Sequence, residues 1–191
     1  MATYLDGAST LRHLTCPQLL DPILGRGARF VAPVKKVAPR DLRATEGEMA
    51  NWDSYTGPHG AGYSEEVYLM ELFADEAGMT QALLKSADGA RGALVSINVR
   101  ELPFMTLWKN AASPQAGYVT GLEPSNSFPL PKPIERVAGR IPKLKGRESY
   151  RTKVTFTGLV SGEEVESAEG SIGELQRADP EIQISPFESD E

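Results

Sequence analysis

The sequence predicts an all-β fold, an antiparallel β-sandwich, and three observations indicate this class. Glycine and proline number 18 and 14 and are scattered along the chain, so long uninterrupted helices are disfavoured. Short segments in the middle of the chain alternate apolar and polar residues with a period of two, as half-buried strands do. Turn-forming pairs such as Asp88-Gly89 and Lys145-Gly146 separate these segments. Many short strands joined by turns are typical of a sandwich or barrel.

Residues 93–100 and 148–159 carry the clearest strand pattern. In the first segment one side is formed by Val95, Ile97 and Val99. The second is rich in β-branched and aromatic residues, and its two alternating sets are Tyr150, Thr152, Val154 and Phe156, and Arg151, Lys153, Thr155 and Thr157. Both segments are therefore predicted as half-buried strands.

Four further segments are predicted to extend the sheets. Residues 65–75 are apolar on both faces, so we expect a central strand that is covered on both sides. Strands are also expected over 102–108 and 117–123, and Pro124 should end the second of them. Residues 79–88 fit either a strand that enters a hairpin or the one helix-like stretch of the chain.

The two ends differ from the middle and divide the chain into three parts. Residues 161–191 are acidic and poor in apolar residues, and we expect a flexible tail because little apolar surface is available to offset the entropy of ordering. The alternative is a short helix or strand that docks there. Residues 1–20 show no periodicity and stay unassigned. The sandwich itself is expected over 21–160.

The composition excludes several classes of protein. A net charge of -6 speaks against non-specific nucleic-acid binding, which needs a basic face. Cys16 is the only cysteine and His13 and His59 are the only histidines, so neither a disulfide framework nor a metal cluster is expected. No apolar run approaches the roughly 20 residues of a membrane-spanning helix, and no secretory leader pattern is visible. We therefore expect a cytoplasmic protein that does not associate with membranes.

Residues 102–133 hold the most unusual set of side chains. Glu123 ends an alternating strand, so its carboxylate should point into a cleft or into water. A carboxylate partly withdrawn from water can act as a general base; the alternative is a solvated strand-end glutamate. Trp108 is a candidate platform for a sugar ring, with Lys109 and Asn110 placed to bond its hydroxyls. The alternative is a core tryptophan beside a solvated lysine.

A second candidate region is the loop over residues 52–66. His59 lies between Pro58 and Gly60 and could serve as a general acid, because imidazole exchanges protons near neutral pH; the alternative is an exposed surface histidine. Glu65 and Glu66 alternate in direction, so one of them should face a cleft. Cys16 has no basic helix end nearby to activate it and is not expected to be a nucleophile.

Several motifs, taken in order, resemble a known superfamily. They are LPFMTLWKN, GYVTGLEPSNSFP and ERVAGRIPKLKGRESY, with DPILGRGARFVAPVKKVAPRD and GYSEEVYLMEL upstream. They are similar to the C-terminal half of aldose 1-epimerase-like proteins, in an uncharacterised bacterial branch of the galactose mutarotase-like superfamily. The resemblance runs from about Asp21 to about Val160, and its most specific part is G-L-E-P.

This resemblance implies a β-supersandwich that binds an aldose without a cofactor. It implies that Glu123 is the base that takes the proton of the anomeric hydroxyl, while a histidine protonates the ring oxygen and the ring opens. The candidates for binding such a sugar are the residues named above: Trp108, Lys109, Asn110, Glu65 and His59. Members of the superfamily are longer, and their His-x-Asn is replaced here by Cys16-Pro17-Gln18.

Three interpretations follow from this comparison with the superfamily. The first is an aldose 1-epimerase, and the second is a carbohydrate-binding module without catalysis. The third is a sandwich that is incomplete at its N-terminus and needs a partner chain. In the third case we expect self-association through exposed sheet edges, because unpaired edge strands template pairing with another chain.

Overall fold

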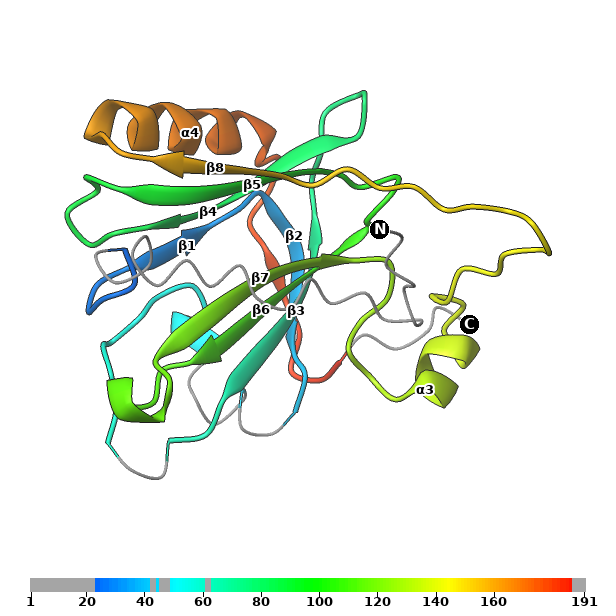
Figure 1. The fold of residues 1–191 in the computed structure, drawn as a ribbon, viewed down its shortest axis with the longest axis horizontal. Coiled ribbons are helices and arrows are strands. Elements are labelled where there is room, and N and C mark those ends of the chain that lie inside the picture. The colour runs from blue at the N-terminus through cyan, green and yellow to red at the C-terminus, as the bar shows by residue number, and fades with distance from the viewer. Residues whose placement is uncertain (1–22, 42–43, 45–48, 61–62, 187–191) are drawn as a thin grey trace.

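The computed structural model describes residues 23–41, 44, 49–60 and 63–186 and places two β-sheets face to face (Figure 1). The four-stranded sheet has the order β1-β4-β5-β8, and the five-stranded sheet has the order β7-β6-β3-β2-β9. All described pairs are antiparallel except β2 with β9. The strands are β1 (Arg29–Val31), β2 (Val34–Pro39), β3 (Glu66–Leu72), β4 (Met79–Lys85), β5 (Gly92–Asn98), β6 (Phe104–Asn110), β7 (Val119–Ser125), β8 (Thr155–Leu159) and β9 (Glu181–Ile182). The predicted β-sandwich is confirmed.

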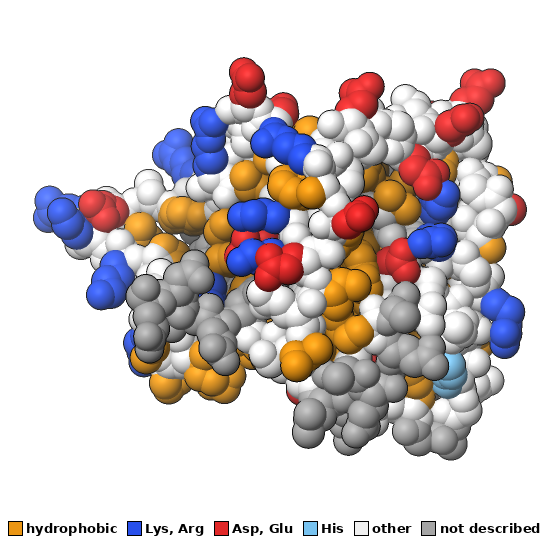
Figure 2. All heavy atoms as spheres, turned by 180° about the vertical axis from the view of Figure 1, so that it is seen from behind, with side chains coloured by type: hydrophobic (Ala, Val, Ile, Leu, Met, Phe, Trp, Pro, Cys, Tyr) orange, Lys and Arg blue, Asp and Glu red, His pale blue; other side chains and the backbone are white. Residues whose placement is uncertain are grey.

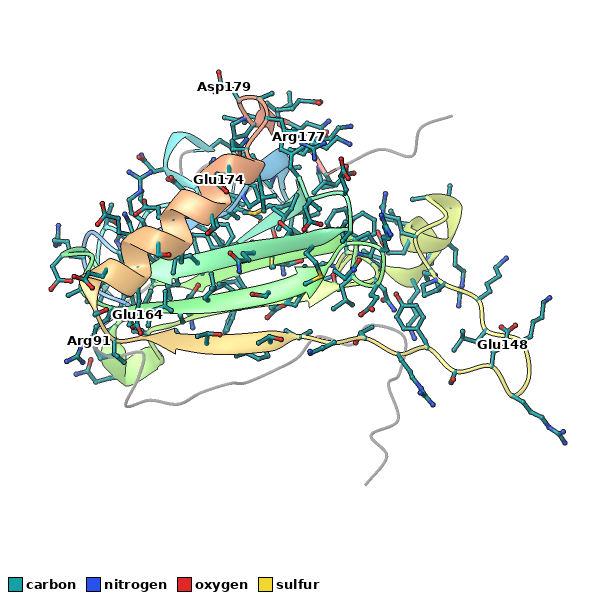
Figure 3. The ribbon with its side chains drawn as sticks, turned by 90° about the horizontal axis from the view of Figure 1, so that it is seen from above. Arg91, Glu148, Glu164, Glu174, Arg177 and Asp179 are labelled. Atoms are coloured by element: carbon teal, nitrogen blue, oxygen red, sulfur yellow. The ribbon has the colours of Figure 1, made fainter. Side chains whose placement is uncertain are left out.

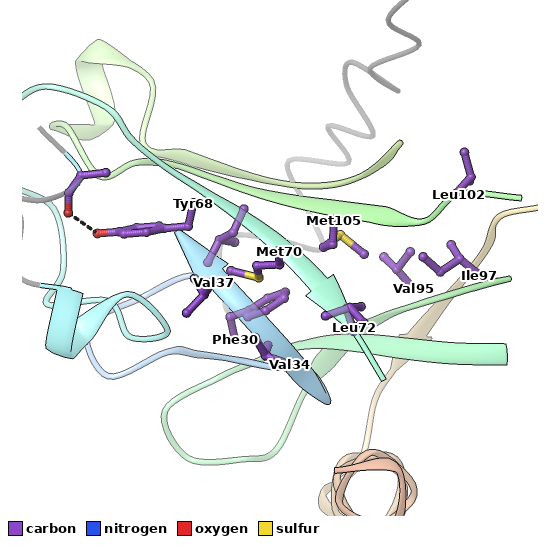
Figure 4. Close-up of a cluster of buried hydrophobic side chains, with 13 residues drawn as sticks. Phe30, Val34, Val37, Tyr68, Met70, Leu72, Val95, Ile97, Leu102 and Met105 are labelled. Carbon is purple, nitrogen blue, oxygen red and sulfur yellow. Dashed lines mark hydrogen bonds between the residues drawn. The ribbon is translucent and has the colours of Figure 1, made fainter. Parts of the chain in front are cut away.

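The space between the sheets is filled by apolar side chains from both of them (Figure 4). Phe30, Met70 and Ile97 are each at most 1% exposed and come from different strands. Alternation along each strand sends every second side chain into this layer. The hydroxyl of Tyr68 donates to the carbonyl of Ala44 at one end of it. The two sheets therefore share a single core.

The expected strand pattern holds with three differences. Residues 79–85 form a strand, so the helix-like alternative for that stretch is wrong. Pro124 does not end β7, because the strand runs on to Ser125; β7 is the edge strand of its sheet, where a missing N–H is tolerated. Only the second half of the segment 148–159 is paired, as β8. The part of the segment before Thr155 extends beyond the sheet without a partner strand among the described residues.

The prediction of a flexible tail over 161–191 is wrong for its first half. Helix α4 (Gly162–Leu175) covers the outer face of the four-stranded sheet (Figure 3). Its buried side chains are Val165, Ala168 and Ile172, and their spacing places them on one side of a helix. They pack on Leu83, Leu94 and Leu159. Three well-spaced apolar residues are enough to dock a helix that is otherwise acidic.

Local signals also define where α4 begins. The Ser161 side chain accepts from the Glu164 backbone N–H at 3.3 Å, and the Glu164 carboxylate accepts from the Ser161 N–H at 3.2 Å. This reciprocal capping box satisfies donors that have no partner inside the helix. After the helix, β9 adds a parallel strand to β2. Residues 1–20 lie outside the described residues.

A connecting segment covers part of the outer face of the five-stranded sheet. After β7 the chain passes through Phe128 to α3 (Lys132–Val137). Phe128 is 2% exposed and packs with Val67, Leu69 and Trp108. Two short 3₁₀ turns, Met49–Asn51 and Pro114–Ala116, complete the described elements. The face seen in Figure 2 mixes acidic and basic side chains around hydrophobic ones.

Candidate functional site

Strand register determines which candidate side chains share a face of the five-stranded sheet. Thr106 lies opposite Glu123, and Trp108 lies opposite Gly121. Directly opposed residues in an antiparallel pair project to the same side. Trp108 packs with the cluster on the outer face of the sheet, so Glu123 and Thr106 project to that face as well. The structure thus brings the two principal candidates, Glu123 and Trp108, to one surface.

The Glu123 carboxylate lies over Gly121, two residues back along β7. A Cβ built at residue 121 would be 2.8 Å from Oε1 of Glu123 and 3.2 Å from its Cγ. Any side chain at that position would therefore have to displace the carboxylate. Because Gly121 is the cross-strand partner of Trp108, the folded-back carboxylate comes next to the tryptophan position. Glycine in this strand is explained by a close approach of that kind.

Trp108 is held by a second carboxylate. Its indole Nε1 donates to Oε2 of Glu65 at 2.8 Å, while Nη2 of Arg40 donates to Oε1 of Glu65 at 3.1 Å. Arg40 also contacts Asp41 at 2.8 Å. The Glu65 carboxylate thus links the tryptophan on β6 to the residue that follows β2. The ring edge is fixed, and Trp108 remains half-buried rather than a core residue.

The hydroxyl of Thr106 adds a polar atom to this face. Thr106 is 2% exposed, and its Oγ1 has no hydrogen-bond partner among the described residues. A buried polar atom without a partner is costly and is uncommon in native proteins. It lies directly across from Glu123 in the sheet. The face therefore combines a carboxylate, a hydroxyl and an aromatic ring, a donor and acceptor set suited to a small polyhydroxyl ligand.

Lys109 projects to the opposite face, into the core. Its side chain is 6% exposed, and Nζ donates to the carbonyl oxygen of Ser54 at 2.8 Å and lies 3.5 Å from the Glu66 carboxylate. Nζ also lies 4.9 Å from the ring centre of Tyr55 and 5.5 Å from that of Tyr68. Burial lowers the pKa of Lys109, and the carboxylate of Glu66 opposes that shift. The structure does not bring Lys109 together with Glu123.

Tyrosine side chains line the same inner network. Burial raises the pKa of Tyr55, Tyr63 and Tyr68, and the charge of Glu66 adds to the shift at Tyr63 and Tyr68. Tyr55 shares a 2.6 Å hydrogen bond with Thr120, whose hydroxyl donates to the Trp108 carbonyl at 2.7 Å. These hydrogen bonds on the inner face therefore hold β6 in place at Trp108. The carboxylate of Glu123, the hydroxyl of Thr106 and the ring of Trp108 lie on the other, outer face of the sheet.

His59 and Asn110 lie at the end of β6. Asn110 donates to the carbonyl of Gly117 at 3.2 Å. The exposed imidazole of His59 shares a 3.0 Å hydrogen bond with Thr56 and stacks on Tyr63. The His59 N–H is bound to the carbonyl of Ala111, which lies about 16 Å along the strand from Thr106 at the usual rise per residue. The structure therefore does not bring His59 to Glu123.

Sequence reasoning missed three features of this face: the support of Glu65 by Arg40, the ion pair of Glu135 with Arg140, and the close approach of the Glu123 carboxylate to Gly121. Arg40, which supports Glu65, gives no pattern in the sequence. The ion pair between Glu135 and Arg140 is buried, with distances of 2.7 and 3.0 Å, and Glu135 also accepts from the Phe128 N–H at 3.0 Å. Only the glycine within the strand G-L-E was a usable signal, because glycine there indicates a close approach. The contact of Arg40 with Glu65 joins residues 25 apart in the chain, and the Glu135–Arg140 pair has no recognisable sequence pattern.

Comparison with known proteins places the chain in a family. Residues 8–157 match the model of a family described as a domain of unknown function, DUF4432. The chain belongs to this family. A search of curated proteins finds no match.

A solved structure shares both sequence and fold with the chain. It is the crystal structure of a putative aldose 1-epimerase from Klebsiella pneumoniae subsp. pneumoniae MGH 78578, which is 33% identical with a TM-score of 0.84. The match covers 89% of this chain and 44% of that one. The chain thus spans less than half the length of that relative. The DUF4432 sandwich described above has an aldose epimerase-like fold.

The described residues contain neither a membrane-spanning helix nor a cluster of metal-binding side chains. No helix in that part of the chain is both long and apolar enough to cross a bilayer. Within the same residues, His, Cys, Asp and Glu side chains do not gather in threes in a way that could hold a metal ion. His13 and Cys16 lie outside the described residues.

Proposed function

We propose that this DUF4432 chain binds an aldose on the outer face of its five-stranded sheet and takes part in interconverting the sugar's anomers. The observation that carries the proposal is the Glu123 carboxylate, folded over Gly121 beside Trp108. A ring pinned at its indole N–H offers a flat apolar surface for the C–H groups of a sugar. The similarity to the Klebsiella protein supports an aldose as the ligand.

In this proposal Glu123 acts as the general base. Its carboxylate accepts the proton of the anomeric hydroxyl as the bond between C1 and the ring oxygen breaks. The hydroxyl of Thr106, buried across the strand from Glu123, bonds a neighbouring hydroxyl of the sugar. The ring oxygen gains its proton from a solvent water molecule in this proposal, because no histidine of the described residues lies beside Glu123. Of the described residues only His59 is a histidine, and its imidazole bonds Thr56.

A second function follows from that position of His59. A face that holds the sugar without an acid beside it would be a carbohydrate-binding module that does not catalyse ring opening. The two functions differ in a single measurement, because both require binding and only the first requires turnover. Trp108 reports binding in each case.

Polarimetry on freshly dissolved α-aldoses tests the catalytic proposal. Glu123→Gln should slow mutarotation by about 10²–10⁴-fold, the usual contribution of a general acid–base group, while binding persists. The matched control is Glu71→Gln. The Glu71 carboxylate lies on β3, on the same outer face of the sheet as Glu123, and pairs with exposed Lys35. A Glu123→Gln protein with full activity would remove Glu123 from the reaction.

Tryptophan fluorescence separates binding from catalysis. In a Trp52→Phe background, Trp108 is the sole tryptophan, and saturating sugar should change its emission. A change without mutarotation in the parent protein would favour the binding module. A parent protein with neither signal for any common aldose would contradict both functions.

A further inference from the structure

The free edge of the four-stranded sheet combines unpaired backbone with exposed apolar side chains. Among the described strands, β8 pairs only with β5. Phe156 lies opposite Val95, a core residue, so its side chain projects to the inner face of the sandwich. It is nevertheless 44% exposed. An edge strand with a bare apolar face is a template for pairing with a further strand.

The chain before β8 extends this edge. Residues 148–154 continue the alternation of β8, with Tyr150 and Val154 in step with Phe156. In Figure 3 this segment, which carries the labelled Glu148, runs outward in line with β8. The segment is anchored at Glu101, where the carboxylate accepts from the Lys153 N–H at 2.9 Å and the carbonyl accepts from the Tyr150 hydroxyl. Val154 is partly buried against the core. A sequence with the pattern of a long strand is thus paired over only its second half.

We propose that a second copy of this chain completes the sheet, by antiparallel pairing of the two β8 edges about a twofold axis at Thr155. Two-fold pairing of identical strands is the simplest closed way to cover an edge. In this register each residue lies opposite the one at the mirrored position around 155. Val154 faces Phe156 of the second copy, so the apolar side chains meet on the inner face.

Charge is compatible with the same register. The basic residues Arg151 and Lys153 face Leu159 and Thr157 of the second copy, so like charges are not opposed. Directly opposed like charges would destabilise the pair. The continuous sheet would cover the apolar face of Phe156 from both chains. A strand from a different polypeptide could occupy the same edge, and the experiments below distinguish that outcome.

Substitutions at Thr157 test the register through self-association. Thr157 is exposed on the outer side of β8, and the proposal places it opposite Lys153 of the second copy. Sedimentation velocity over a dilution series should show a monomer–dimer equilibrium. Thr157→Glu should tighten it and Thr157→Lys weaken it, each by about 2- to 30-fold across the two symmetric pairs. Lys153→Glu combined with Thr157→Lys should restore dimerisation.

Disulfide trapping tests the twofold axis directly. In a Cys16→Ser background, Thr155→Cys should form a covalent dimer on mild oxidation, because residues at the axis approach within disulfide range. Thr152→Cys is the control, since its two copies would lie about 20 Å apart. A wild-type monomer at every soluble concentration would overturn the proposal. A dimer in which Thr155→Cys is trapped no faster than Thr152→Cys would overturn the pairing.

Discussion

Oε1 of Glu123 lies 2.8 Å from the position that a Cβ of residue 121 would occupy. The glutamate side chain thus takes up the room that the glycine leaves free on the outer face of the sheet. This relationship ties the G-L-E sequence to the geometry of the candidate site. It also gives a way to move the carboxylate without removing it.

Gly121→Ala should impair mutarotation while leaving the fold intact. The added methyl displaces the Glu123 carboxylate, whereas alanine itself is favoured over glycine inside a strand by about 0.5–1 kcal/mol. We expect a fall in activity of at least about tenfold with an unchanged or raised midpoint of thermal unfolding.

The double variant Gly121→Ala/Glu123→Ala identifies the cause of that loss. If the methyl acts only through the carboxylate, Gly121→Ala should have no further effect once Glu123 is alanine. Gly170→Ala, on the open surface of α4, is the control for a general effect of alanine. An active Gly121→Ala protein would show that the position of the carboxylate is not critical.

Lys109→Met should destabilise the protein strongly. The ammonium is enclosed by the Glu66 carboxylate, the carbonyl of Ser54 and two tyrosine rings. Its removal leaves the Glu66 carboxylate, which is only 14% exposed, without its cation, at a cost of up to about 3–5 kcal/mol. Urea unfolding measures the change in free energy. Lys35→Met, at an exposed pair with Glu71, should cost under about 1 kcal/mol, and equal effects would contradict this account.

The sequence predicts most of the strands because their alternation is local. Residues 93–98 and 66–72 are strands as expected, and so are 104–110 and 119–125. The tail prediction failed because it counted acidic residues over 161–191 without weighing the spacing of Val165, Ala168 and Ile172. The unpaired half of 148–159 could not be foreseen, because pairing depends on which strand lies alongside.

The candidate site was only partly predictable, for the same reason. Glu123, Trp108 and Glu65 share a region of one face, but register and long-range contacts bring them there. One correction was available from the sequence. Trp108 and Lys109 are neighbours on a strand, so they must project to opposite faces, and both cannot contact one ligand. The buried pair of Glu135 and Arg140 gave no local signal.

The stability of the protein should fall steeply above about pH 10. The ordinary pKa of tyrosine is 10.0, and burial raises it at Tyr55, Tyr63 and Tyr68. Above that pH the unfolded chain releases these protons and the native chain keeps them. Because the native state then binds more protons, the free energy of unfolding decreases as pH rises. Lys109, with its lowered pKa, acts in the opposite direction, but only below the ordinary lysine value of 10.5.

Urea unfolding between pH 8 and 12 measures this dependence. Tyr55 is 2% exposed, so Tyr55→Phe should reduce the slope above pH 10 by up to about 1.4 kcal/mol per pH unit. Absorbance at 295 nm should show buried tyrosines ionising together with unfolding. Stability that is flat up to pH 12 would contradict the assignment.

Arg140→Leu should destabilise the protein more than replacement of the whole pair. Glu135 is 2% exposed, and its carboxylate receives both the Arg140 guanidinium and the N–H of Phe128. Removing the cation alone leaves a buried charge, at a cost of about 3–5 kcal/mol. The double variant Glu135→Leu/Arg140→Leu removes both charges and should recover a large part of that loss.

Arg140 also lies 5.3 Å from the Phe128 ring, and Phe128 packs near Trp108. The fluorescence of Trp108 in a Trp52→Phe background therefore reports whether the segment that carries Phe128 moves. Chemical unfolding of the four proteins of this cycle gives the coupling energy. Costs that simply add would show that Glu135 does not depend on Arg140, and the segment that carries Phe128 would then be held by its apolar contacts alone.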